Sequence, residues 1–140
     1  MALEIILGII YSSLLEWWLH KIPLHKSFLF KNHIEHHKLT GKDMIDNDYF
    51  NSLFGGGEVL FAIFIAILHL PLLLCLKYFY ITFVCYLILY LIVHRLSHTN
   101  IIFAKKYVPW HYIHHCINAK KNFGIIHPFI DIIFGTYKSL

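Results

Sequence analysis

Residues 33–37 read HIEHH and residues 111–115 read HYIHH, so the pattern HxxHH occurs twice in a chain of 140 residues. On a helix, residues i, i+3 and i+4 lie on one face, and each pattern therefore presents its imidazoles toward one point. Imidazole is the commonest metal ligand among side chains, and its neutral form binds readily near physiological pH. We expect a helix over 32–39 and another over 107–117, both facing a common metal site.

Two further histidine pairs have spacings that suit the same site. His20 and His25 form HxxxxH, and His94 and His98 form HxxxH. Pro23 lies between the first two, so we expect the first helix to end near Ile22 and the chain to turn there, which lets both imidazoles converge. One such pair alone would be weak evidence, but four clusters where apolar spans meet water predict a dinuclear metal site. The ten candidate ligands are His20, His25, His33, His36, His37, His94, His98, His111, His114 and His115.

The composition indicates a membrane protein, because 58% of the residues are hydrophobic, which is too apolar for an ordinary soluble domain of this size. Three stretches are long enough to cross a bilayer, at about 2–19, 58–74 and 78–93. Glu4 and the Glu16-Trp17-Trp18 sequence argue against a cleavable signal peptide, so the first span is expected to be retained. The predicted fold is a single all-α integral-membrane domain over 1–140, with about three transmembrane helices and a helical cap that carries the histidines.

Charge predicts the orientation of this domain. If the first span enters the cytoplasm, all four histidine clusters lie on the cytoplasmic face. Eleven of the twelve Lys and Arg residues lie there too, and only Lys77 lies across the membrane. An excess of Lys and Arg in cytoplasmic loops is the usual bias of membrane proteins. The predicted location is the endoplasmic reticulum in a eukaryote or the inner membrane in a bacterium.

Carboxylates are few, and three lie near the clusters: Glu16, Glu35 and Asp131. Each is a candidate to accept the spare N–H of a ligating imidazole, although helix capping or solvation accounts for them equally well. His127 follows residues 122–124 closely and is the fourth candidate neighbour of the site.

The other residues that could bind a metal, one histidine, one glutamate and three cysteines, are expected to lie outside the site. His69, near the turn between the last two spans, is expected to be an ordinary core or surface histidine. Glu58 is expected to cap the start of the second span. Cys75, Cys85 and Cys116 form no CxxC pair and are expected to be small apolar or interfacial residues.

The four clusters resemble the histidine boxes of a known family when they are read with two later segments. These segments are Asn122-Phe123-Gly124 and, at 131–137, DIIFGTY. The set resembles the fatty acid hydroxylase superfamily of integral-membrane di-iron oxygenases, which also contains sterol desaturases and methylsterol oxidases and is related to beta-carotene hydroxylases. The resemblance extends from about Glu16 to Tyr137. The HxxxH spacing at His94 and the closing D-x-x-F-G-T are more similar to the fatty acid and sterol branch than to the carotenoid branch.

This resemblance implies that the ten histidines bind two irons, which activate O2 to hydroxylate or desaturate a lipid C–H bond. A fatty acyl chain is the expected substrate. The alternatives are a sterol or a carotenoid, or a non-catalytic metal-binding membrane protein. Imidazole suits zinc as well as iron, so the donor set by itself leaves the metal open. Candidates to line a path for an apolar substrate are Phe61, Phe64, Phe79, Phe83, Tyr86 and Tyr90, although lipid contact or helix packing also accounts for them.

The resemblance also bears on partners. Larger members of the superfamily have a further transmembrane helix, and some have a fused haem-binding domain, neither of which occurs in this sequence. We therefore expect electrons from a separate donor such as a cytochrome b5 or a ferredoxin, no nucleic-acid partner, and an open choice between monomer and oligomer. Lysines that suit an acidic donor are Lys31, Lys38, Lys42, Lys105, Lys106, Lys120 and Lys121. Positive-inside topology and contact with anionic lipid explain the same lysines.

Overall fold

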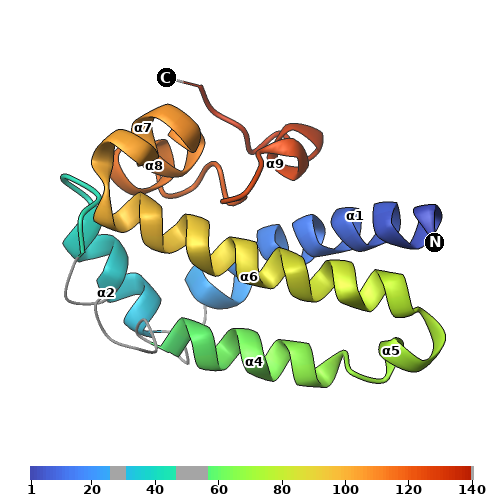
Figure 1. Cartoon of the computed structure of the whole chain (residues 1–140). Coiled ribbons are helices and arrows are strands. Elements are labelled where there is room, and N and C mark those ends of the chain that lie inside the picture. Colours follow the sequence, from blue (N-terminus) through green and yellow to red (C-terminus); the bar gives the residue numbers. More distant parts are fainter. Residues whose placement is uncertain (26–30, 47–56, 140) are drawn as a thin grey trace.

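The protein is all-helical in the part that this computed structural model describes, residues 1–25, 31–46 and 57–139 (Figure 1). This confirms the predicted all-α class. The elements are α1 (Ala2–Leu19), the π-helical turn η1 (His20–Leu24), α2 (Lys31–Thr40), α4 (Glu58–Leu68), α5 (Leu72–Cys75), α6 (Lys77–Thr99), α7 (Ile101–Tyr107), α8 (Pro109–Cys116) and α9 (Phe129–Ile133).

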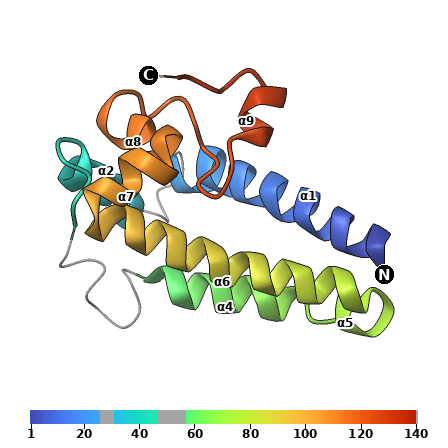
Figure 2. The same cartoon turned by 45° about the horizontal axis from the view of Figure 1, so that its top comes forward.

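Helices α1 and α6 lie side by side and form the long axis of the molecule (Figures 1 and 2). Gly8 of α1 allows this close packing, because a Cβ at this position would lie 3.0 Å from Cβ of Thr82 and 3.1 Å from the carbonyl oxygen of Phe79. Small residues at such contacts are typical of helix pairs that pack in a bilayer. The two helices therefore form a close pair, against which α4 packs from the α6 side.

Two helical stretches are long and apolar enough to cross a membrane, Ala2–Leu24 and Lys77–Thr99, each with 23 residues. They correspond to the first and third predicted spans. The second predicted span, 58–74, is not one helix. Helix α4 ends at Leu68 after 11 residues, Pro71 follows, and α5 is a separate short helix. Eleven residues extend only about 16 Å, whereas a bilayer core is about 30 Å thick. A third transmembrane helix is therefore not confirmed.

The first helix continues past the predicted break at Pro23. Instead of ending near Ile22, α1 passes into η1, a π-helical turn that includes Pro23. In a π-helix the hydrogen bonds join residues i and i+5, so side chains five apart come close to one face. The rings of His20 and His25 accordingly lie with their centroids 5.1 Å apart. The predicted convergence of the two imidazoles is confirmed, but a wider helical turn produces it and not a helix end.

A cap of short helices covers the end of the bundle where α1 and α6 finish (Figure 2). The helices predicted over 32–39 and 107–117 are present as α2 and α8. Helix α7 was not predicted, although Asn100 is a recognisable N-cap residue. Its side-chain oxygen accepts hydrogen bonds from the backbone N–H groups of Ile102 and Phe103, at 3.1 and 3.0 Å. Pro109 then occupies the first turn of α8, where its missing N–H has no cost.

Candidate metal centre

All ten candidate histidines meet at the cap end of the bundle. They come from four elements that are distant in sequence, namely η1, α2, α6 and α8. Eight of them are buried, and His25 and His37 are partly buried. Burial of so many imidazoles in one place needs partners for their nitrogen atoms, since a buried polar group without one is costly.

The imidazole nitrogens form two adjacent groups. One group is His20, His25, His33 and His37, and the other is His36, His94, His98 and His115. Within each group the candidate donor atoms lie within 4.8 Å of one another. A third set, His37, His114 and His115, overlaps both groups, and the rings of His37 and His115 stack with centroids 4.0 Å apart. Helix α2 contributes to both groups because His33 and His37, which are four residues apart, lie in the first group, whereas His36 is turned toward the adjacent second group.

Three imidazoles have their Nδ1 atoms fixed by backbone carbonyl oxygens. The contacts are His20 to Phe123 at 2.7 Å, His98 to Met44 at 2.8 Å and His114 to Lys121 at 2.6 Å. A carbonyl oxygen only accepts, so in each neutral ring the proton is on Nδ1 and Nε2 carries a lone pair. The backbone of the cap thus selects the tautomer that binds a metal through Nε2.

Two carboxylates fix further rings. Nδ1 of His94 lies 2.8 and 2.9 Å from the carboxylate oxygens of Glu58, and Nδ1 of His36 lies 3.3 Å from Asp46. Such carboxylate–imidazole pairs orient metal ligands and raise their basicity. Neither role was predicted from the sequence. Glu58 was predicted to cap the second span, but the N-cap residue of α4 is Gly57, and no side-chain cap hydrogen bond forms there.

Because these contacts hold the Nδ1 atoms, the Nε2 lone pairs of the second group point toward one another. The Nε2 atom of His98 lies 3.2 Å from that of His36 and 3.1 Å from that of His94. With all three protons on Nδ1, these nitrogens have no proton to share, and a cation between them would relieve their mutual repulsion. The buried Nε2 atoms of His20 and His115 have no hydrogen-bond partner among the described residues. The donor set therefore fits a pair of metal ions.

Burial favours the neutral form of several of these imidazoles. It lowers the pKa of His36 and of His25 to about 4, and that of His114 to about 3. Burial is also the main cause that lowers the pKa of His37, and the neighbouring His114 adds to the effect. An imidazole binds a metal only in its neutral form, so the lone pairs are available well below pH 7.

Two of the four candidate neighbours of the site lie away from the histidine groups. Glu35 is exposed on α2 and makes no hydrogen bond to any imidazole that the structure describes. His127 is also exposed. Its Nδ1 accepts a hydrogen bond from the backbone N–H of Phe129 at 3.0 Å, and its ring faces Trp110. The helical position of Glu35, on the face opposite to the histidines, explains the first result.

Glu16 and Asp131 are buried near the groups but bind backbone and hydroxyl groups, not imidazole. Glu16 accepts hydrogen bonds from the N–H groups of Ile125 and Ile126, at 2.7 and 3.2 Å, and from the hydroxyl of Tyr86 at 2.5 Å. The expected contact of these two carboxylates with an imidazole is therefore wrong. They act one step further away, by holding the segment after α8 in place.

The segment Asn122-Phe123-Gly124 connects the buried carboxylate of Asp131 to the histidines. Asn122 has a positive φ of 58°, which asparagine tolerates, and its side chain exchanges two hydrogen bonds with the backbone of Lys138. Asp131 accepts from the N–H groups of Phe123 and Gly124, at 2.9 and 2.8 Å. At Gly124 a Cβ would lie 2.6 Å from a carbonyl oxygen, so only glycine fits. The segment thereby aims the Phe123 carbonyl at His20.

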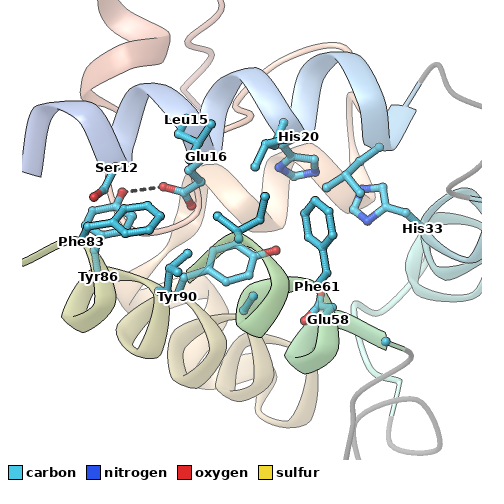
Figure 3. A pocket seen from close by; sticks show the side chains of 16 residues that line it. Ser12, Leu15, Glu16, His20, His33, Glu58, Phe61, Phe83, Tyr86 and Tyr90 are labelled. Atoms are coloured by element: carbon cyan, nitrogen blue, oxygen red, sulfur yellow. Dashed lines mark hydrogen bonds between the residues drawn. The ribbon is translucent and has the colours of Figure 1, made fainter. Parts of the chain in front are cut away.

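An apolar cavity of about 250 Å³ leads from the bundle to the histidines. Figure 3 shows it between α1 on one side and α4 and α6 on the other, with His20 and His33 at one end. Four of the six aromatic residues proposed from the sequence line it, namely Phe61, Phe83, Tyr86 and Tyr90. An apolar ligand in this cavity would lie beside His20 and His33 of the first histidine group.

Replacement of Glu58 by glutamine is expected to weaken metal binding about 10- to 100-fold, because His94 loses the carboxylate that orients it. The measurement is a competition titration with a metal chelator of known affinity. Glu35→Gln, an identical change at an exposed site on α2, serves as the matched control. Equal affinities of the two variants would contradict the role of Glu58.

Comparison with known protein families supports one assignment. Residues 5–136 match the family model described as Fatty acid hydroxylase, which is nearly the whole chain. The parallel comparisons found no match among curated proteins and none among solved structures.

Proposed function

The chain belongs to the fatty acid hydroxylase family, and from this premise we propose that it is a membrane-bound di-iron oxygenase. In this proposal it uses O2 to hydroxylate or desaturate a C–H bond of a lipid, with a fatty acyl chain as the substrate. The observation that carries the proposal is that one of two adjacent imidazole groups lies at the end of an apolar cavity, which His20 and His33 line. A site for metal storage would not need such a cavity.

The number of donors favours iron over zinc. Structural zinc sites have four ligands, and catalytic zinc sites usually have three. Here the two groups of four are joined by His114, whose Nε2 lies 3.1 Å from that of His25, and by His111, whose Nε2 lies 3.2 Å from that of His98. Five imidazoles for each ion exceed what tetrahedral zinc uses.

The residues of the chain divide the work in the proposed reaction. Two bound irons would supply the activation of O2 and the removal of hydrogen from an unactivated carbon. The imidazoles hold the ions, and Glu58 and Asp46 keep His94 and His36 in the orientation that presents Nε2. The cavity holds an apolar chain, excludes water from it, and places one of its carbons beside His20 and His33.

The membrane and the electron donor complete the proposal. Ala2–Leu24 and Lys77–Thr99 would cross the bilayer with the histidines on the cytoplasmic face. A separate acidic protein such as a cytochrome b5 or a ferredoxin would supply electrons, docking on the exposed lysines around the cap. Those that the structure describes as exposed are Lys38, Lys42, Lys105, Lys106 and Lys120, and Lys121 is partly exposed; the side chain of Lys31 lies outside the described residues.

The deciding experiment measures metal content and product together. Protein is purified anaerobically in mild detergent, and iron and zinc are counted per chain by atomic spectroscopy. The expected result is about two irons, together with an oxidised lipid that forms when O2 and a reductant are added. Zinc alone after iron-replete growth, with no oxidised lipid, would contradict the proposed oxygenase and favour a non-catalytic metal-binding protein.

A further inference from the structure

One end of the cavity lies far from the histidines. There it is lined by Ser12 of α1 and Phe83 of α6 (Figure 3). Ser12 precedes His20 by eight residues along the helix, which corresponds to a depth of about 12 Å at 1.5 Å per residue. The cavity is thus a pocket of limited depth.

Phe83 forms the end of this pocket and is fully buried. Two rings stand around it. The centroid of His69 lies 4.6 Å from that of Phe83, and the centroid of Tyr11 lies 6.0 Å from it. A side chain that contacts rings from two other elements cannot move aside without disturbing both.

Hydrogen bonds fix the rings behind Phe83. Nδ1 of His69 donates to the carbonyl oxygen of Ile65 at 2.8 Å, so Nε2 is the acceptor for the hydroxyl of Tyr11 at 2.7 Å. This pair joins α1 to the end of α4, directly behind a side chain of α6. The pair is partly buried, and its hydrogen bonds fix the positions of both rings. It therefore braces Phe83 at the end of the pocket.

We infer that Phe83, braced by Tyr11 and His69, is the wall that stops the apolar end of the lipid substrate. An amphiphile keeps its polar group in water, so its apolar end enters the pocket first and stops at Phe83. The distance from wall to histidines then selects which carbon reacts, counted from the apolar end. The choice of the reacting carbon rests on the proposed function, whereas the role of Phe83 in stopping the chain concerns lipid binding alone.

The pocket depth gives the expected chain length. Carbon–carbon bonds of about 1.5 Å advance somewhat less than their length along an extended chain, so roughly ten carbons span the 12 Å. Each added carbon that enters the pocket is expected to increase affinity about fourfold, and this gain should stop once the chain reaches Phe83.

The test is a displacement titration with straight-chain fatty acids of increasing length against a fluorescent fatty acid, on metal-free full-length protein in one detergent. In Phe83→Ala the chain length at which the affinity gain stops is expected to increase by about three carbons, because the ring spans roughly three carbon–carbon bonds. Comparison between variants at one detergent concentration cancels the partition of each acid into micelles. Ile88→Ala, which shortens an exposed side chain of the same helix, is expected to leave the limit unchanged.

A second variant moves the limit the other way. Ser12→Leu adds bulk to the same end of the pocket from α1 and is expected to shorten the longest chain that still gains affinity, so the inference stays testable if Phe83→Ala does not fold. If a folded Phe83→Ala or Ser12→Leu protein keeps the same chain-length limit, Phe83 does not stop the lipid. Iron-dependent product together with unchanged limits would contradict only this role of Phe83. Shifted limits in a protein that makes no product would support the role of Phe83 and contradict only the proposed function.

Discussion

Replacement of His98 by alanine is expected to reduce lipid oxidation to background and to lower the iron content from about two per chain to one or less. His98 is the central member of the second histidine group. Its Nε2 atom lies within 3.2 Å of the corresponding atoms of His36, His94 and His111. Removal of this ring therefore takes a donor from the middle of the group, where no other side chain can replace it.

The fold is expected to survive this change, because the ring's hydrogen bond to the described backbone is the one to the carbonyl oxygen of Met44, whose loss costs about 1–3 kcal/mol. Iron is measured by atomic spectroscopy, product by mass spectrometry, and stability by thermal unfolding of the metal-free protein. His127→Ala is the matched control, since it removes an exposed imidazole that lies outside both groups. Full oxidation activity in His98→Ala would rule out the assigned centre.

Replacement of Asp131 by alanine is expected to lower the free energy of unfolding by about 4 kcal/mol, since each buried donor left without a partner costs about 1–3 kcal/mol. The carboxylate is fully buried and accepts from the N–H groups of Phe123 and Gly124 and from the hydroxyl of Thr136. Alanine leaves all three donors without it. Denaturant unfolding of the metal-free protein measures the loss.

The same change is expected to weaken metal binding in the first histidine group, because the Phe123 carbonyl that orients His20 is held by Asp131. Asp43→Ala is the control. Asp43 is exposed and accepts one hydrogen bond, from the N–H of Ile45, so its loss should cost well under 1 kcal/mol. A destabilisation by Asp131→Ala no larger than that of Asp43→Ala would contradict the scaffold role.

The candidate ligands were predictable because their signals are local. In HIEHH and HYIHH, a helical period of 3.6 residues is enough to bring three imidazoles toward one side, whatever the rest of the chain does. The apolar runs of α1 and α6 are equally local, and their starts were predicted to within one residue, although the helical stretches continue five and six residues past the predicted ends. The end of α4 was not predicted correctly, because Pro71 interrupts a long apolar run only if the residues around it form a turn and do not continue the helix.

The groups that hold the ligands depended on contacts between distant segments. Glu58 meets His94 across 36 residues, and Asp131 reaches His20 only through the Phe123 carbonyl. The sequence contains the carboxylates, but their partners follow from helix packing. For this reason Glu16 and Asp131 were correctly singled out with the wrong contacts, and Glu58 was assigned to a cap.

By itself, then, the sequence determined the helical class, the two long apolar helices and the ten histidines, because residue type and spacing along one helix specify them. Only the tertiary structure decided which imidazoles share a group, which tautomer five of them adopt, and that an apolar pocket ends at Phe83. These features depend on where α1, α4, α6 and the cap meet. Their positions follow from side-chain packing across the whole chain, which no local pattern encodes.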